Sequence, residues 1–271
     1  MRSSRVREAA VAGSFYPGDP ETLRVAVHQL LADVPPPPED APVPQAVIVP
    51  HAGYVYSGST AALAYARVAR GRDSIRRVVV IGPTHRVPVR GVALSGADGF
   101  RTPLGVLPVA EAWAEERLVG VSAVCVFGET HRSEHAVEVQ LPFLQLTLDR
   151  VEIVPLLAGD ATGDEVADVL DELWGGPETL IVISSDLSHY LPYEQARRVD
   201  AGTIAQINAL DGSLDHTQAC GATAVNGLLV AARRHGLRPV LLGACNSGDT
   251  AGDRSRVVGY SAFAFEGDDD A

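Results

Sequence analysis

Four short hydrophobic runs along the chain each lead into a residue with a reactive polar side chain. Runs of this length, rich in Val and Ile, are typical of strands buried on both faces of a parallel sheet. Helix-like segments separate them, so the pattern predicts βαβ units in an α/β fold: a three-layer α/β/α sandwich with a mostly parallel central sheet. The runs are residues 46–50, which lead into His51; 77–83, into His85; 180–185, into Asp186 and His189; and 240–244, into Cys245.

The segments between these runs predict helices, a hairpin and a last strand. Asp19 and Pro20 are typical of a helix cap and a first helical position, and Ser133 is a candidate cap for a helix over 134–148. We expect a single domain over residues 1–265, followed by an acidic, disordered tail at 266–271. The predicted helices are 20–31, 57–70, 134–148, 164–173, 194–209 and 217–234; a hairpin is expected at 100–108 and an edge strand at 257–265.

Composition narrows the classes of function. The chain has 271 residues, 46% of them hydrophobic, which is enough for one α/β domain. Its net charge of -12 argues against nucleic acid or an anionic membrane as a partner. We expect a cytoplasmic protein, because no apolar run approaches the roughly 18 residues that a membrane span needs and no signal core follows the N-terminus. The Ala/Val/Arg-rich, lysine-free composition is typical of a bacterial, GC-rich genome, and the missing lysine excludes Schiff-base and P-loop chemistry.

The residues at the strand ends predict a metal site. Ligands in open α/β sheets bind beyond the carboxyl ends of the strands, so His51, His85 and Cys245 are expected at one edge. A lone loop histidine is more often a hydrogen-bonding residue, and it is the joint placement that indicates a site.

The loop after Cys245 is polar and glycine-rich, whereas we expect Cys125 in the core and Cys220 packed on a helix. Three cysteines without a CxxC pair argue against disulfides or a zinc finger.

Asp186 and His189 form a second candidate group. They lie three residues apart, so a helical turn would place them on one face, where Asp186 could orient the imidazole. His189 is then a candidate general acid or base. A capped turn explains the spacing equally well.

A polar cluster at 131–140 is a candidate support for the site. His135 and Glu138 could line the pocket behind the metal ligands, as could Tyr54. The zinc-binding pattern HExxH is absent from this stretch, and a solvated helix face is the alternative interpretation.

Six ordered motifs resemble those of the Memo family, also described as AmmeMemoRadiSam system protein B. Together they are specific, although each alone is weak. The motifs are VAGSFYP at 11–17, PHAGY at 50–54 with Ser57 and Gly58, GPTH at 82–85, EHAVEVQLPF at 134–143, SSDLSH at 184–189 and CNSGD at 245–249.

The resemblance implies a fold similar to class III extradiol dioxygenases, which open catechol rings with non-haem Fe(II). It also implies that His51, His85 and Cys245 are metal ligands, with His189 at the acid/base position and Asp186 beside it. Those enzymes use a carboxylate where this chain has a thiol. A thiolate is a softer ligand that favours copper, zinc or thiolate-bound iron, which argues against ring cleavage.

Three functional hypotheses remain open. The first is a non-haem iron or copper redox protein, a dioxygenase-like oxidoreductase acting on an unidentified small molecule. The second is a non-catalytic metal carrier, or a scaffold that uses the cleft to bind a partner; the third is a zinc-dependent hydrolase. The family resemblance also implies an association with AMMECR1-like and radical SAM proteins. The metal, the substrate, physiological partners and the oligomeric state are left open by the sequence.

Overall fold

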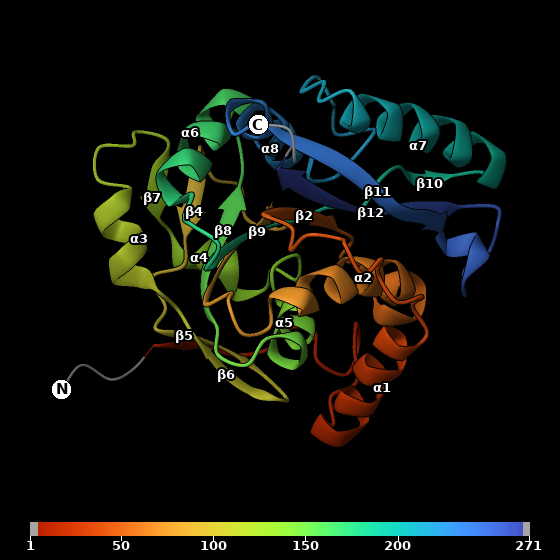
Figure 1. Cartoon of the computed structure of the whole chain (residues 1–271), viewed down its shortest axis with the longest axis horizontal. Helices are drawn as coiled ribbons and strands as arrows, with labels where there is room; N and C mark the ends of the chain where they lie inside the picture. The colour runs from red at the N-terminus through yellow and green to blue at the C-terminus, as the bar shows by residue number, and fades with distance from the viewer. Residues whose placement is uncertain (1–4, 268–271) are drawn as a thin grey trace.

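The computed structural model describes residues 5–267, and a nine-stranded mixed sheet forms their centre (Figure 1). The strands follow the order β10-β12-β2-β9-β3-β8-β4-β7, with β11 paired to β12. Neighbours from β2 to β8 pair in parallel, while β12 pairs antiparallel to β2, β10 and β11. The predicted α/β class is confirmed, with a parallel centre inside a mixed sheet. The strands are β2 Ala46–Val49, β3 Arg77–Pro83, β4 Val92–Leu94, β7 Val124–Val126, β8 Glu152–Ala158, β9 Thr179–Ser184, β10 His189–Leu191, β11 Leu237–Asn246 and β12 Val257–Gly267.

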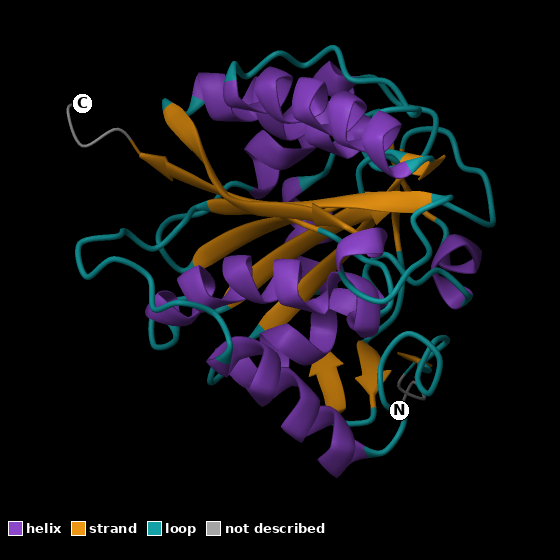
Figure 2. Ribbon diagram, turned by 90° about the vertical axis from the view of Figure 1, so that its right-hand side faces the viewer, coloured by secondary structure: helices purple, strands orange, loops and turns teal. Residues whose placement is uncertain are grey.

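Helices cover both faces of the sheet, as Figure 2 shows. The first face carries α3 Glu111–Arg117, α6 Gly163–Leu173, α7 Tyr193–Asn208 and α8 Ala222–Arg234. The second carries α1 Pro20–Ala32, α2 Tyr54–Val68 and α5 Leu141–Thr147. Asp19 caps α1 and Pro20 opens it, as predicted.

The central strands are hydrophobic throughout because both of their faces are buried. In β3, Val79 and Ile81 pack in the core under α6 and α8, while Val78 and Val80 pack in the core under α2 and α5. All four side chains are fully buried. Side chains alternate between the faces of a strand, so a run without polar positions needs a helical layer on each side.

A small second sheet joins the N-terminus to the predicted hairpin. Strand β1 (Val6–Arg7) pairs in parallel with β5 (Gly99–Thr102), which pairs antiparallel with β6 (Gly105–Pro108). The N-terminal strand therefore lies beside a segment that is more than 90 residues away in the sequence.

The predicted helix over 134–148 is only partly present, because its first four residues are not helical. The structure has α4 at Gly128–Arg132, a short 3-10 turn η2 at Glu138–Gln140 and α5 from Leu141. The Glu134 carboxylate accepts hydrogen bonds from the backbone N–H groups of His135 (2.8 Å) and Ala136 (3.0 Å), which replaces helical pairing there. Pro142 then fits the first turn of α5, where its missing N–H costs nothing.

The C-terminal strand also differs from the expectation. β12 lies inside the sheet, and β11 forms the edge beyond it. β12 continues to Gly267, two residues into the stretch that was expected to be a disordered tail. Glu266 is buried there and forms ion pairs with Arg67 and Arg238. The remaining tail residues, 268–271, lie outside the described part of the chain.

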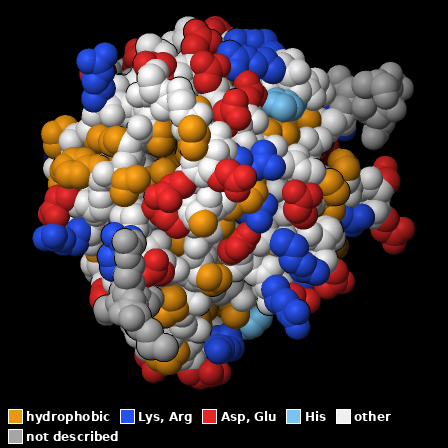
Figure 3. All heavy atoms as spheres, turned by 90° about the vertical axis from the view of Figure 1, so that its left-hand side faces the viewer, with side chains coloured by type: hydrophobic (Ala, Val, Ile, Leu, Met, Phe, Trp, Pro, Cys, Tyr) orange, Lys and Arg blue, Asp and Glu red, His pale blue; other side chains and the backbone are white. Residues whose placement is uncertain are grey.

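On the molecular face in Figure 3, acidic and basic side chains are interspersed. Mixed charges of this kind are typical of an ordinary solvated protein surface. Among residues 5–267, none of the helices has the length and hydrophobicity that a membrane crossing requires.

Replacing Glu266 with Ala should destabilise the fold strongly. The substitution leaves the buried Arg67 guanidinium without its ion-pair partner, which typically costs about 3–5 kcal/mol. Chemical denaturation would measure the loss. Asp149→Ala is the matched control, because Asp149 pairs with Arg72 in solvent and such pairs contribute up to about 1 kcal/mol. Equal losses in the two variants would contradict the role assigned to Glu266.

Candidate metal centre

Three histidines from separate parts of the chain meet at the carboxyl edge of the sheet. His51 follows β2, His85 follows β3, and His135 lies between α4 and η2. One ring nitrogen of each lies within 4.8 Å of the other two. The His85 and His135 rings stack at 4.7 Å, and the His51 ring is perpendicular to both at 5.3 Å. The arrangement matches three ligands around one ion.

Glu134 holds two of these rings. Its carboxylate lies 2.8 Å from Nδ1 of His85 and 3.1 Å from Nδ1 of His135, and it accepts the His85 backbone N–H at 2.7 Å. Burial alone would raise the pKa of Glu134, but the hydrogen bonds from His135 and His85 outweigh burial and hold the pKa well below its usual range. An ionised carboxylate only accepts hydrogen bonds, so both rings must carry their proton on Nδ1. Their Nε2 lone pairs are therefore free for a metal.

Ser184 determines the tautomer of His51. The Ser184 hydroxyl donates its single proton to the Ala136 carbonyl at 2.6 Å, so it must accept from Nδ1 of His51 at 2.9 Å. Burial first, then the neighbouring His135 and His85, lowers the pKa of His51 far below its usual value. A neutral ring protonated on Nδ1 presents its Nε2 lone pair, as the other two rings do.

Cys220 is the cysteine that lies beside His51 of the cluster. Its Sγ is 3.3 Å from Nε2 of His51, and burial raises the pKa of the thiol to about 12. We expected Cys220 on a helix, but α8 begins only at Ala222. Gly221 lets the loop approach β9, since a Cβ there would lie 2.7 Å from the Cβ of Ser185. The glycine directly after the cysteine was the sequence signal for this turn.

Cys245 does not lie with the histidines, which corrects the predicted ligand set. It is on β11, opposite Tyr260 of β12, and its Sγ contacts the Thr60 hydroxyl at 3.1 Å. β12 separates β11 from β2, so Cys245 is two strand spacings, roughly 9–10 Å, from the strand that leads to His51. The hydrophobic run was interpreted as a central parallel strand, whereas β11 is an antiparallel edge strand.

The structure separates Asp186 from the ring of His189. Oδ1 of Asp186 accepts the backbone N–H of His51 at 2.7 Å, while Nδ1 of His189 donates to the Leu187 carbonyl at 2.8 Å. Burial raises the pKa of Asp186. Asp186 therefore positions His51. The ring of His189 is oriented by the backbone carbonyl of Leu187, and not by Asp186 as expected.

Tyr54 and Glu138 support the fold from outside the cavity. The Tyr54 hydroxyl donates to the Val139 carbonyl at 2.8 Å. Glu138 is completely buried, pairs with Arg7 and accepts a 2.5 Å hydrogen bond from Tyr16. Glu138 thus links the N-terminal segment to η2. His135 was expected only to support the metal ligands, but it belongs to the histidine cluster itself.

A cavity of about 750 Å³ opens onto the histidines. It is large enough for a small-molecule ligand, since such pockets typically span roughly 300–1,000 Å³. His189 lines it together with the three histidines, so an imidazole stands in the same space as the candidate metal ligands. Other lining residues include Phe15, Tyr56, Asp186, Tyr190, His216, Cys220, Asp253, Arg256 and Tyr260.

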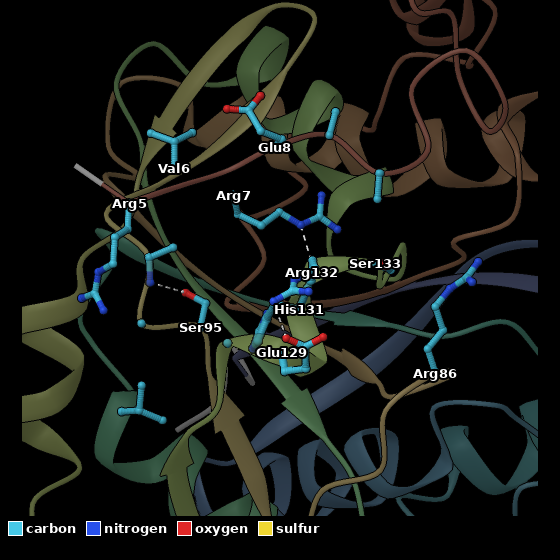
Figure 4. Close-up of a pocket in the computed structure, with 16 residues that line it drawn as sticks. Arg5, Val6, Arg7, Glu8, Arg86, Ser95, Glu129, His131, Arg132 and Ser133 are labelled. Carbon is cyan, nitrogen blue, oxygen red and sulfur yellow. Dashed lines mark hydrogen bonds and ion pairs between the residues drawn. The ribbon is translucent and has the colours of Figure 1, made fainter. Parts of the chain in front are cut away.

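A larger hollow of about 840 Å³ is lined by the N-terminal segment and by the residues just before Glu134 (Figure 4). Arg7 forms part of its wall, but the Arg7 guanidinium is occupied: it pairs with Glu138 and donates to the carbonyls of His131 and Glu134. Arg132 is paired with Glu129 at 2.6 Å. The grouping of metal-ligating side chains found among the described residues lies in the smaller cavity, which we therefore take as the candidate site.

Comparison with known proteins places the chain in a family. The family described as Memo-like protein matches residues 7–264. Proteins described as MEMO1 family protein from Aquifex aeolicus and Archaeoglobus fulgidus are each 35% identical to it, and the alignments cover 96% of this chain and 99% of each relative. A solved structure of an uncharacterized protein from Escherichia coli K12 is similar at a TM-score of 0.49 and 15% identity, over 80% of this chain and 98% of that one. The chain belongs to the Memo-like protein family.

Proposed function

We propose that the chain binds one metal ion through Nε2 of His51, His85 and His135. The observation that carries the proposal is the set of hydrogen bonds to the three Nδ1 atoms. Glu134 and Ser184 accept from these nitrogens and so point three lone pairs at one place. Metal-binding histidines usually donate their second ring nitrogen to a carboxylate or other acceptor in this way.

Cys220 is the fourth candidate donor. Around a tetrahedral ion, a nitrogen and a sulfur ligand lie about 3.5 Å apart, given bonds of about 2.0 and 2.3 Å. Sγ of Cys220 and Nε2 of His51 are 3.3 Å apart. A metal at this place would replace the thiol proton and bind the thiolate.

The function that this site supports best is that of a non-haem iron or copper redox protein. Imidazole suits both metals, and a thiolate favours copper. The bound metal would supply electron transfer to or from a small molecule in the cavity. His189 would hold or release a proton at Nε2, because its Nδ1 is already bonded to Leu187.

A zinc-dependent hydrolase is the second candidate. Three imidazoles next to an open cavity are also the ligand set of zinc sites that activate water. Because Cys245 lies outside the cluster, the candidate ligands are three imidazole nitrogens, a set that the sequence did not suggest. His189 would then be the base near the attacking water.

Metal content distinguishes the new ligand set from the one expected from sequence. Elemental analysis of anaerobically purified protein should find about one iron, copper or zinc ion per chain. His135→Ala should lose most of this metal, because it removes one of three ligands. Cys245→Ser should retain it, because Cys245 contacts Thr60 instead. Metal lost from Cys245→Ser and retained in His135→Ala would reverse the assignment.

Replacing Glu134 with Gln should weaken metal binding by about 10- to 100-fold, as loss of such supporting partners commonly does. The amide keeps the shape but removes the charge that fixes both rings. Competition with a chromogenic chelator would measure the affinity. Glu129→Gln on α4 is the matched control, since Glu129 is exposed and its one ion pair within residues 5–267 is with Arg132. An unchanged affinity in Glu134→Gln would contradict the role of the carboxylate.

Two activity assays separate the candidate reactions. The redox proposal predicts oxygen uptake by the iron- or copper-loaded protein in the presence of a small reductant, lowered at least about tenfold in His189→Gln. The hydrolase candidate predicts hydrolysis of p-nitrophenyl acetate by the zinc-loaded protein, with the same loss. Metal-loaded protein that is inactive in both assays would exclude both reactions for these substrates and leave a non-catalytic role, as a metal carrier or a partner-binding scaffold.

A further inference from the structure

Tyr190 adopts a backbone conformation that a tyrosine rarely takes. Its φ is 58°, in the left-handed region, and Leu210 is the other non-glycine residue of the described chain with a positive φ, at 53°. Leu210 directly follows the C-cap of α7, where left-handed residues commonly end a helix. Tyr190 lies within β10, so a helix end does not explain its conformation. Conformations of this kind cluster at functional sites.

A β-bulge is the local cause. His189 is opposite Val258 and Leu191 is opposite Val257, so Tyr190 is an extra residue in β10 without a partner in β12. The bulge lets both His189 and Tyr190 line the cavity, although neighbouring residues of a regular strand point to opposite faces. The Tyr190 side chain is 62% exposed, so packing into the core does not compensate for its backbone strain.

Arg256 supplies a positive charge beside this ring. Its guanidinium carbon lies 5.0 Å from the centre of the Tyr190 ring, and both residues line the cavity. Arg256 has no ion pair with any acidic side chain of residues 5–267. The two acidic residues that line the cavity have other hydrogen-bond partners: Asp253 accepts from the backbone and hydroxyl of Ser255, and Asp186 accepts from the backbone of His51.

Aromatic side chains form much of the remaining wall. The Phe15 ring lies 4.7 Å from that of His135, and Tyr56 and Tyr260 also line the cavity. Tyr56 is 39% exposed. Flat apolar surfaces around a single unpaired cation select for planar ligands of the opposite charge.

We propose that the cavity takes a planar aromatic ligand with one negative charge, its anionic group on Arg256 and its ring against Tyr190. The proposal rests on the metal site above, since it names the class of ligand that would lie beside that metal. It assigns Arg256 and Tyr190 as residues that determine ligand specificity.

Isothermal titration of the zinc-loaded protein with three probes tests the role of the charge and of planarity. Benzoate is planar and anionic, benzamide is planar and neutral, and cyclohexanecarboxylate is anionic but not planar. Benzoate should bind at least about tenfold more tightly than benzamide, in keeping with one charged hydrogen bond. Arg256→Gln should abolish this preference, and Arg254→Gln should retain it. Arg254 is a matched control two residues away, because it lies over Tyr193 and near Asp249 outside the cavity.

Tyr190→Gly separates a functional ring from a structural one. Glycine accepts a positive φ without strain, so the melting temperature should stay the same or rise. The preference for benzoate over cyclohexanecarboxylate should fall. A lower melting temperature with an unchanged preference would overturn the role of Tyr190, and an unchanged preference for benzoate over benzamide in Arg256→Gln would overturn that of Arg256.

Zinc content, measured on every sample, keeps the two proposals distinguishable. Wild-type protein that fails to retain zinc contradicts the metal site itself. Protein that retains zinc but binds the three probes equally contradicts only the ligand class.

Discussion

The candidate site depends on one buried carboxylate. Glu134 accepts hydrogen bonds from Nδ1 of His85 and of His135 and from three backbone N–H groups, those of His85, His135 and Ala136. Without such donors, burial would raise the pKa of this carboxylate and favour its protonated form. Held as an anion, it joins the end of β3 to the loop after α4 and fixes both rings in one tautomer. Replacing this residue would disturb ring orientation, ligand basicity and local chain path together.

The support for Glu134 reaches back to the start of the chain. Arg7 donates to the carbonyls of His131 and Glu134 and pairs with Glu138, which also binds the backbone N–H of Ala10 at 2.8 Å. Arg7 and Glu138 are buried, so their charges must be paired to be tolerated. Glu138 was expected beside the metal ligands and instead holds the segment that carries Glu134. The same N-terminal segment brings Phe15 to the wall of the cavity.

The sequence predicted those parts of the site that depend on local pattern. His51 and His85 follow buried parallel strands, and a strand that ends at the sheet edge brings its next residue to that edge. Cys245 also follows a hydrophobic run, but composition does not reveal that this run, β11, pairs with β12 at the edge of the sheet. His135 and Cys220 reach the site through loops whose paths depend on Glu134 and Gly221. Such paths are set by contacts between residues far apart in the sequence, so hydrophobic periodicity does not report them.

X-ray absorption spectroscopy of the metal-loaded protein tests the central claim most directly. The account predicts imidazole scattering from about three nitrogens at roughly 2.0–2.1 Å, with any sulfur contribution lost in Cys220→Ser and unchanged in Cys245→Ser. A spectrum with oxygen ligands and no imidazole scattering would show that the three histidines do not hold the metal. Sulfur scattering lost in Cys245→Ser would contradict the position of that thiol next to Thr60.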